Sequence, residues 1–245
     1  MKINKHCPHC MRDAFSISQL NTLIFKIEQQ QLMDDGVHPV QCPRGHEFVV
    51  LFNGAKFEVL FDIAMNAIRD GYAREAVSSF ASSLERFYEF FIRYAYYDKT
   101  DSNEFNAAWK SVSSQSERQL GAYLFVYLNR YNSAPTLLSQ KMVTFRNTVI
   151  HKGYIPTLSE AIDFGKAVHN LIMGVIAKLE IDEDKQLANF YQTMLPKAKG
   201  HAWTVNQSPQ AISLGTLYKT PDISKPTRCK EYDVVLKEFG LAATQ

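Results

Sequence analysis

The sequence predicts a mainly α-helical protein, built as an antiparallel helical bundle with a small β subdomain at its N-terminus. Apolar residues recur with the helical period from about residue 55 to about residue 180. Residues 1–54 instead hold three of the four cysteines and short aromatic and β-branched runs, which are typical of strands. We therefore expect three parts: a small cysteine-containing subdomain at 1–54, the bundle at 55–181, and a C-terminal helix with a basic extended tail at 182–245.

Composition places the chain among ordinary globular proteins. Of its 245 residues, 46% are hydrophobic and 21% charged, which allows a sizeable core. The formal net charge of +2 argues neither for nor against a nucleic-acid partner. Polar residues interrupt the first twenty positions, and no apolar stretch approaches the roughly 20 residues that a bilayer requires. We expect a soluble, cytoplasmic protein with reduced or metal-bound cysteines and no membrane partner.

The N-terminal part contains two predicted strands and a turn. The segments "TLIFKIE" (22–28) and "EFVVLF" (47–52) favour short strands. The sequence "DDG" (34–36) is typical of a turn. These elements indicate a small sheet.

The bundle is predicted from its apolar stripes. A first helix begins near residue 55, Gly71 interrupts the pattern, and a long second helix reaches "YAYYDKTD" (94–101). We expect a loop within 111–118, a buried helix at 119–128 and a break at "NSAP" (132–135).

The last two helices of the bundle are separated by a short connection. The first begins near Thr136 and ends before Gly153, and Pro156 prevents its continuation. Thr157 and Glu160 match a capping box that opens the second. We expect that helix to end near "LEIDED" (179–184).

Four residues of the N-terminal part have the spacing of a metal site. Cys7 and Cys10 form one chelating pair, and Cys42 and His46 form another about thirty residues later. Two such loops supply the four ligands of a tetrahedral zinc ion, so we expect residues 1–54 to form a zinc-ribbon-like subdomain. With four protein ligands the site is closed, so we interpret the zinc as structural and as the element that allows this small part to fold.

Alternatives to this ligand set remain open. His6 and His9 lie near the first pair, although His46 has the better spacing. The three cysteines could also be reduced thiols beside a strand. Cys229 is left over, and we interpret it as a lone thiol.

A second set of polar residues lies at the end of the 136–153 helix. Arg146 and His151 differ by roughly 140° around a straight helix, whereas Asn147 and His151 share a face. Asn147 could therefore orient the imidazole, while Arg146 presents a forked donor to a phosphate. A helix C-terminus also favours the imidazolium form of His151. The simpler alternative is a histidine that caps the helix.

The segment "RNTVIH" (146–151), between the last two helices of a bundle, resembles the R-N-x3-H signature of HEPN domains. The resemblance covers about residues 55–180. It implies a HEPN-like bundle and a metal-independent endoribonuclease, with catalytic residues Arg146, Asn147 and His151. The imidazole would transfer protons and Arg146 would stabilise charge on the phosphorus.

The resemblance also implies a homodimer that acts on RNA. Two facing motifs would form one composite site, which would bring together residues that one helix keeps apart. The setting implied is a toxin or an anti-phage defence effector, with an antitoxin or regulatory protein as a possible partner. Some HEPN toxins have a tyrosine two residues after the histidine, whereas Tyr154 is three residues after His151. Glu85 could contact Arg146, or be an ordinary solvated residue beside Arg86.

The C-terminal tail is basic. Residues 196–230 contain six Lys or Arg and one acid, with Trp203 and Tyr218 among them. Such a segment could hold RNA by phosphate contacts and base stacking. The alternative is an extended arm that wraps the protein's own core or its partner. For the whole chain, the rival interpretation is a non-catalytic module that binds nucleic acid or protein.

Overall fold

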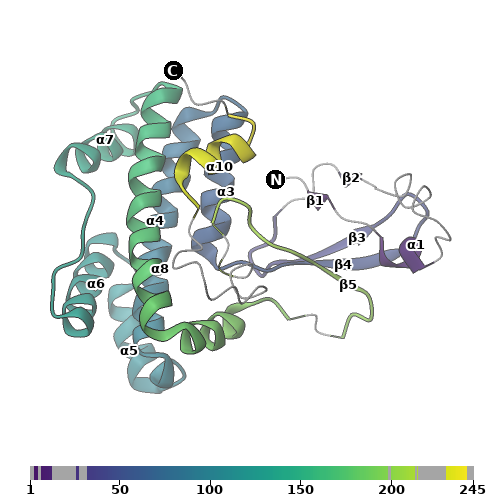
Figure 1. The fold of residues 1–245 in the computed structure, drawn as a ribbon, viewed down its shortest axis with the longest axis horizontal. Coiled ribbons are helices and arrows are strands. Elements are labelled where there is room, and N and C mark those ends of the chain that lie inside the picture. The colour runs from purple at the N-terminus through teal and green to yellow at the C-terminus, as the bar shows by residue number, and fades with distance from the viewer. Residues whose placement is uncertain are drawn as a thin grey trace.

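In a computed structural model, the chain is described at residues 3–4, 7–12, 26–27, 32–197, 200–212, 214 and 230–241. A group of packed helices forms one end of the molecule, and a narrow three-stranded sheet extends from it as an arm (Figure 1). The expectation of a mainly helical protein with a small sheet is confirmed. None of the helices in the described residues combines the length and the apolarity that a bilayer crossing requires.

The arm is built around a hairpin. Strand β3 (Val37–Gln41) and strand β4 (Glu47–Phe52) pair in antiparallel register, with Val40 opposite Phe48. The turn expected at 34–36 precedes β3, and the strand expected at 47–52 is β4. Helix α1 (Pro8–Arg12) packs at the tip of the arm, far from the bundle (Figure 1). Strands β1 (Ile3–Asn4) and β2 (Lys26–Ile27) form a separate small ladder, and the rest of the 22–28 segment lies outside the described residues.

A third strand joins the sheet from the C-terminal part of the chain. Strand β5 (Thr204–Gln207) pairs in parallel with β4, which lies in the middle of the order β3-β4-β5. Part of the predicted tail therefore packs on the chain itself, as one of the two alternatives proposed. Of the six basic residues counted there, four lie outside the described residues, as does Tyr218.

The bundle is centred on three helices, α3 (Lys56–Arg69), α4 (Ala73–Ala95) and α8 (Leu158–Met194). Their shared core is rich in aromatic residues, including Phe57, Phe61, Phe80, Phe91 and Phe164. Helix α4 is central because it also contacts α6 (Ser116–Tyr131) and α7 (Gln140–His151). The turn η1 (Tyr97–Lys99) and helix α5 (Asn103–Val112) connect α4 to α6, and α10 (Tyr232–Glu238) packs on α8.

Three helical predictions are corrected by the structure. Helix α6 was expected to be buried, but Phe125 on its outer side is 76% exposed. Helix α7 begins at Gln140, not near Thr136, because Ser139 Oγ caps it by accepting from the amide of Met142. Helix α8 continues past 179–184 to Met194, because Leu187, Phe190 and Tyr191 continue its buried stripe.

The connection between α7 and α8 follows the prediction. Gly153 has a φ of 72° just after α7, a conformation that glycine adopts without strain. The Thr157 side chain accepts from the amide of Glu160, and Glu160 accepts from the amide of Thr157. The capping box therefore fixes the start of α8 and the position of the preceding turn.

Candidate functional site

The tip of the arm brings the four predicted metal ligands together. The ligand atoms of Cys7, Cys10, Cys42 and His46 all lie within 4.8 Å of one another. Nδ1 of His46 lies 3.3 Å from Sγ of Cys10, 3.5 Å from that of Cys42 and 3.8 Å from that of Cys7. The sulfur atoms of Cys10 and Cys42 are 4.0 Å apart.

These distances can be compared with a tetrahedron around one ion. Metal–sulfur bonds of about 2.3 Å and a metal–nitrogen bond of about 2.0 Å would place the nitrogen about 3.5 Å from each sulfur, and the sulfurs about 3.8 Å apart. The observed separations scatter around these values. The Cys3His group could therefore hold a metal ion.

The loop between β3 and β4 fixes the position of Cys42 in the cluster. The amide of Gly45 donates to the carbonyl of Cys42, and the amide of Cys42 donates to the carbonyl of His46, which closes a tight turn. Burial alone would raise the pKa of the Cys42 thiol, but the amides of His46 and Arg44 lower it. Burial raises the pKa of the Cys10 thiol to about 11. Both cysteines lie among neighbours that exclude water.

His9 is not one of the four clustered ligands. Its ring stacks on His46 at 5.1 Å between centroids and lies tilted against Trp203 at 4.3 Å, and Nε2 lies 3.3 Å from the carbonyl oxygen of Glu47. The guanidinium of Arg12 lies over the Trp203 ring, 5.4 Å from its centroid. His6 and Cys229 lie outside the described residues. Trp203, considered as a base-stacking residue, is instead engaged in covering the cysteine–histidine cluster.

The Arg–His motif lies on the other side of the molecule, on the last turns of α7. Nη2 of Arg146 donates to Oε1 of Glu85 on α4 at 2.7 Å, so the contact considered for Glu85 is made. Nη1 of Arg146 donates to Oδ1 of Asn147 at 3.0 Å. Both partners of the ion pair are about three-quarters buried, and the guanidinium is held at a fixed place beside α4.

His151 is exposed at the end of the same helix. Asn147 was expected to orient it, but the Asn147 oxygen accepts from Arg146. Within the described part of the chain, the His151 ring has no hydrogen-bond partner. The structure thus fixes Arg146 and leaves His151 accessible.

Tyr154 follows in the connection to α8. Its hydroxyl lies 3.2 and 3.3 Å from the two carboxylate oxygens of Glu160, the residue that caps α8. Hydrogen bonding to this carboxylate raises the pKa of Tyr154. The contact ties the phenol to the start of α8 while leaving the ring 42% exposed.

The sequence patterns described above did not identify two groups of interacting polar residues. Glu58 and Asp62 on α3 are buried carboxylates that accept hydrogen bonds from the backbone amides of Gln210, Ala211 and Leu214. Arg86, Glu89 and Arg93 form a ladder along α4. The spacing of the ladder, three and then four residues, was a readable signal for a shared helix face. No sequence signal marked Glu58 and Asp62 as buried, because their partners are backbone groups about 150 residues further along the chain.

Comparison of the chain with family models, curated proteins and solved structures gave no match.

Proposed function

We propose that the protein is a metal-independent endoribonuclease of the HEPN type that acts as a homodimer. The observation that carries the proposal is the arrangement at the end of α7. A guanidinium anchored by Glu85 and Asn147 lies on the same short helix as His151, which is exposed and has no hydrogen-bond partner among the described residues. An anchored cation and an accessible imidazole are the two groups that cleavage of RNA without a metal requires.

The reaction would proceed by attack of a 2′-hydroxyl on the neighbouring phosphorus. The His151 imidazole of one protomer would take the proton of that hydroxyl. The bond from phosphorus to the 5′-oxygen breaks, and the leaving oxygen receives a proton from an imidazolium. Arg146 would hydrogen-bond the phosphoryl oxygens, where negative charge increases in the transition state. Two copies of the motif would supply both the base and the acid.

Exposed apolar residues beside His151 support the homodimer. Ile155 is 78% exposed, and Tyr154 and Leu158 are also exposed despite their size. They follow His151 directly in the chain, so self-association through them would bring two His151 side chains close together. Exposed apolar residues that cluster in this way are typical of interfaces.

The replacement His151→Ala tests the activity. We expect RNA cleavage in the presence of EDTA to fall at least about 100-fold, since general acid–base catalysis contributes that much or more. The measurement is cleavage of a fluorescent RNA by the purified full chain, with dimerisation measured in parallel by analytical ultracentrifugation.

His201→Ala is the matched control, because His201 is also exposed but lies beside the arm. It should cleave as the wild type does. Cleavage that survives His151→Ala, or that requires an added metal ion, would show that the assignment is wrong.

One observation favours a second function, that of a non-catalytic binding module. Glu85 neutralises Arg146 at 2.7 Å, which weakens the attraction of that guanidinium for phosphate. Under this alternative the ion pair only joins α7 to α4. A wild-type chain that binds RNA without cleaving it, and that remains monomeric, would favour the binding module.

We also propose that the cluster at the tip of the arm holds zinc in a structural role. Three thiolates and one imidazole with tetrahedral spacing match the preferences of this ion. All four ligands come from the protein, so no position is open for a substrate. The role as a toxin or anti-phage effector rests on the resemblance of the R-N-x3-H motif.

A further inference from the structure

A pocket of about 610 Å³ lies where the arm joins the bundle. It is bounded by the residues around the start of β3 and the end of β4, by one side of α3 and α4, and by the end of α8. This volume is within the range of small-molecule sites. None of the residues of the Arg–His motif or of the cysteine cluster lines it.

The pocket has an apolar floor. Val59, Leu60 and Ile63 line it from α3, and Phe190 and Met194 line it from α8. Val59, Leu60 and Ile63 are only partly buried, so their side chains present apolar surface to the pocket. Such a floor favours a ligand with a flat or apolar body.

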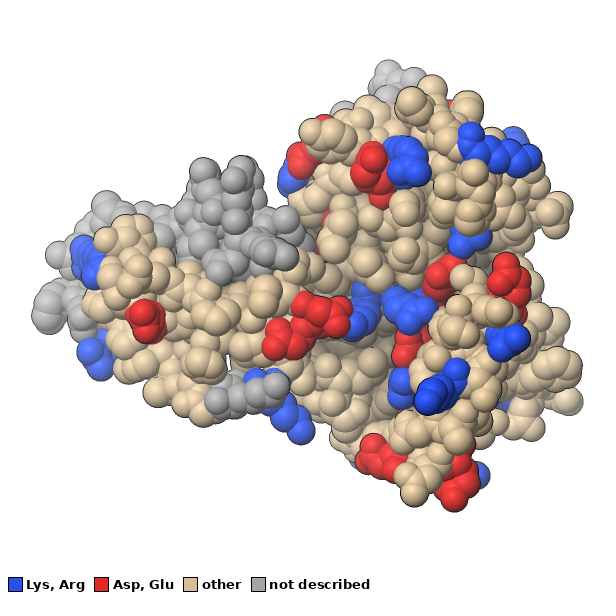
Figure 2. Space-filling view, turned by 180° about the vertical axis from the view of Figure 1, so that it is seen from behind, with Lys and Arg blue, Asp and Glu red and all other residues tan. Residues whose placement is uncertain are grey.

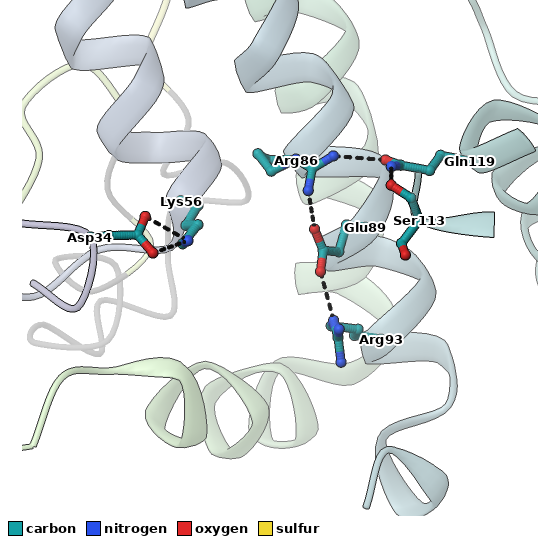
Figure 3. A network of polar contacts seen from close by, with 7 residues as sticks. All are labelled: Asp34, Lys56, Arg86, Glu89, Arg93, Ser113 and Gln119. Carbon is teal, nitrogen blue, oxygen red and sulfur yellow. Dashed lines mark hydrogen bonds and ion pairs between the residues drawn. The ribbon is translucent and has the colours of Figure 1, made fainter. Parts of the chain in front are cut away.

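The two polar sides of the pocket differ in charge. On one side, Nζ of Lys56 lies 2.7 and 2.8 Å from the two oxygens of Asp34, so this pair is neutral. Figure 3 shows this pair on one side and the ladder Arg86, Glu89 and Arg93 on the other. Figure 2, seen from behind, shows basic and acidic side chains together where the arm meets the helices.

The ladder carries an excess of positive charge. Glu89 accepts from Nη1 of Arg86 at 2.7 Å and from Nε of Arg93 at 2.9 Å, so one carboxylate serves two guanidinium groups. All three side chains are at least about 70% buried. A partly buried excess charge of this kind attracts an anion more strongly than a solvated one does.

Arg86 is oriented by a further contact. Its Nη2 donates to Oε1 of Gln119 at 2.9 Å, and Nε2 of the buried Gln119 donates to the carbonyl oxygen of Ser113 (Figure 3). Arg93 lies over the ring of Trp109 at 5.0 Å. These contacts keep both guanidinium groups in place before any ligand arrives, which reduces the entropy cost of binding.

The guanidinium of Arg93 has hydrogen-bond donors that are not used within the described residues. Only its Nε is used in a hydrogen bond, and the described part of the chain offers no acceptor to its two terminal nitrogens. A phosphate can accept two parallel hydrogen bonds from such a fork. On the side of the Lys56–Asp34 pair, the pocket is also lined by Asp35, whose carboxylate can accept from hydroxyl or amino groups of a ligand.

We propose that this pocket binds a phosphomonoester of nucleoside monophosphate size, with its phosphate on Arg86 and Arg93 and its body against α3. The lining argues for this class of ligand, because the cationic Arg86–Glu89–Arg93 ladder and the neutral Lys56–Asp34 pair lie on two sides of the apolar floor (Figure 3). The site is separate from Arg146 and His151, so the proposal does not depend on ribonuclease activity.

Isothermal titration of the full chain with AMP, adenosine and inorganic phosphate tests the proposal. We expect AMP to bind, and adenosine and inorganic phosphate each to bind at least about tenfold more weakly, because each lacks one half of the ligand. Arg93→Gln should weaken AMP binding by at least about tenfold, since it removes the charged donors.

Arg74→Gln is the matched control, because Arg74 lies on the same helix, is exposed and does not line the pocket. A second variant, Thr193→Phe, fills the pocket from an exposed position of α8 without touching the ladder. It should abolish AMP binding. His151→Ala should leave binding unchanged, which separates this site from the proposed RNA site.

Three results would overturn the proposal. The first is no binding of AMP to the wild type. The second is equal AMP binding by the Arg93→Gln and Arg74→Gln variants, which would make the ladder a structural contact only. The third is inorganic phosphate binding as tightly as AMP, which would leave a simple anion site without a role for the apolar floor.

Discussion

At the scale of single residues, two buried carboxylates hold the C-terminal part of the chain to the bundle. Glu58 accepts from the amides of Ala55 and Leu214 and from the hydroxyl of Tyr191, and its side chain is fully buried. Asp62 accepts from the amides of Gln210 and Ala211, both at 2.8 Å. These bonds tie the backbone at Gln210, Ala211 and Leu214 to α3, and so help to position β5, which ends at Gln207.

The charge on these carboxylates makes stability depend on pH. Burial raises the pKa of Glu58 to about 7 and that of Asp62 to about 6, although their hydrogen bonds oppose this change. A raised pKa means that the folded chain binds the proton more tightly than the unfolded chain does. The contribution of Glu58 to stability is therefore complete below pH 4.5 and is lost as the pH rises through about 7.

Glu58→Gln tests this dependence. We expect the free energy of unfolding of the wild type, relative to that of the variant, to fall between pH 4.5 and pH 7. The fall should amount to a few kcal/mol, since one pKa unit corresponds to about 1.4 kcal/mol. Urea titrations at several pH values measure it.

Glu75→Gln provides the comparison, because Glu75 is an exposed residue on α4. Its unfolding free energy should follow that of the wild type across this range. A difference between wild type and Glu58→Gln that stays constant with pH would mean that Glu58 does not titrate there.

At the scale of elements, the arm has a core of its own. Val40, Phe48 and Val50 pack with the three cysteines, and Trp203 and Val205 cover them. This cluster is distinct from the aromatic core of the bundle. Because so few apolar residues hold the arm, most of its stability should come from the metal that we propose at its tip.

Cys42→Ser should therefore unfold the arm and spare the bundle. Zinc measured by plasma mass spectrometry should fall from about one ion per chain to well below one, since a ligand is lost. The helical circular dichroism should stay close to that of the wild type, and the Trp203 fluorescence should change. Met33→Ser, an exposed site outside the cluster, is the control.

An unaltered zinc content in Cys42→Ser would contradict the assigned ligands. Loss of the helical signal together with the metal would contradict the independence of the two cores.

The elements that could be predicted from the sequence are those whose signals lie in neighbouring residues. The end of α7 and the start of α8 were predictable, because helix-ending and helix-capping residues affect only the adjacent backbone. These residues are Gly153, Pro156, Thr157 and Glu160. The four clustered ligands were predictable for a similar reason, since each pair is local and the spacing is characteristic. His46 could be chosen as the fourth member of the cluster because its spacing from Cys42 is that of a chelating pair.

The rest depended on contacts between distant segments. Strand β5 has four residues, and its pairing with β4 uses only backbone groups, so no side-chain pattern marks it. The continuation of α8 was missed because the acids within 179–184 suggest an end, whereas Leu187 and Tyr191 resume the buried stripe. The contact of Glu85 with Arg146 joins residues 61 positions apart.

At the scale of the whole molecule, the exposed apolar residues near His151 bear on assembly. Ile155→Glu places a charge in the middle of the proposed interface, and a buried unpaired charge is costly. We expect the variant to sediment as a monomer and to lose RNA cleavage, while its helical content stays unchanged. Sedimentation velocity and the fluorescent RNA assay measure both effects.

Val234→Glu is the comparison, because Val234 is an exposed apolar residue on α10. It should remain dimeric and active. A dimer that persists in Ile155→Glu would mean that the protomers meet elsewhere, and an active monomer would exclude a composite site.

The middle position of β4 has a consequence for synthesis of the chain. Its two neighbours are translated far apart in time, because about 150 residues separate β4 from β5. At 5–20 residues per second, one side of β4 stays open for roughly 8–30 seconds on the ribosome. During that interval the hairpin presents the unpaired backbone edge that promotes association between nascent chains. Rapid capture of metal by its tip would not close this edge, and only release of residue 207 does so.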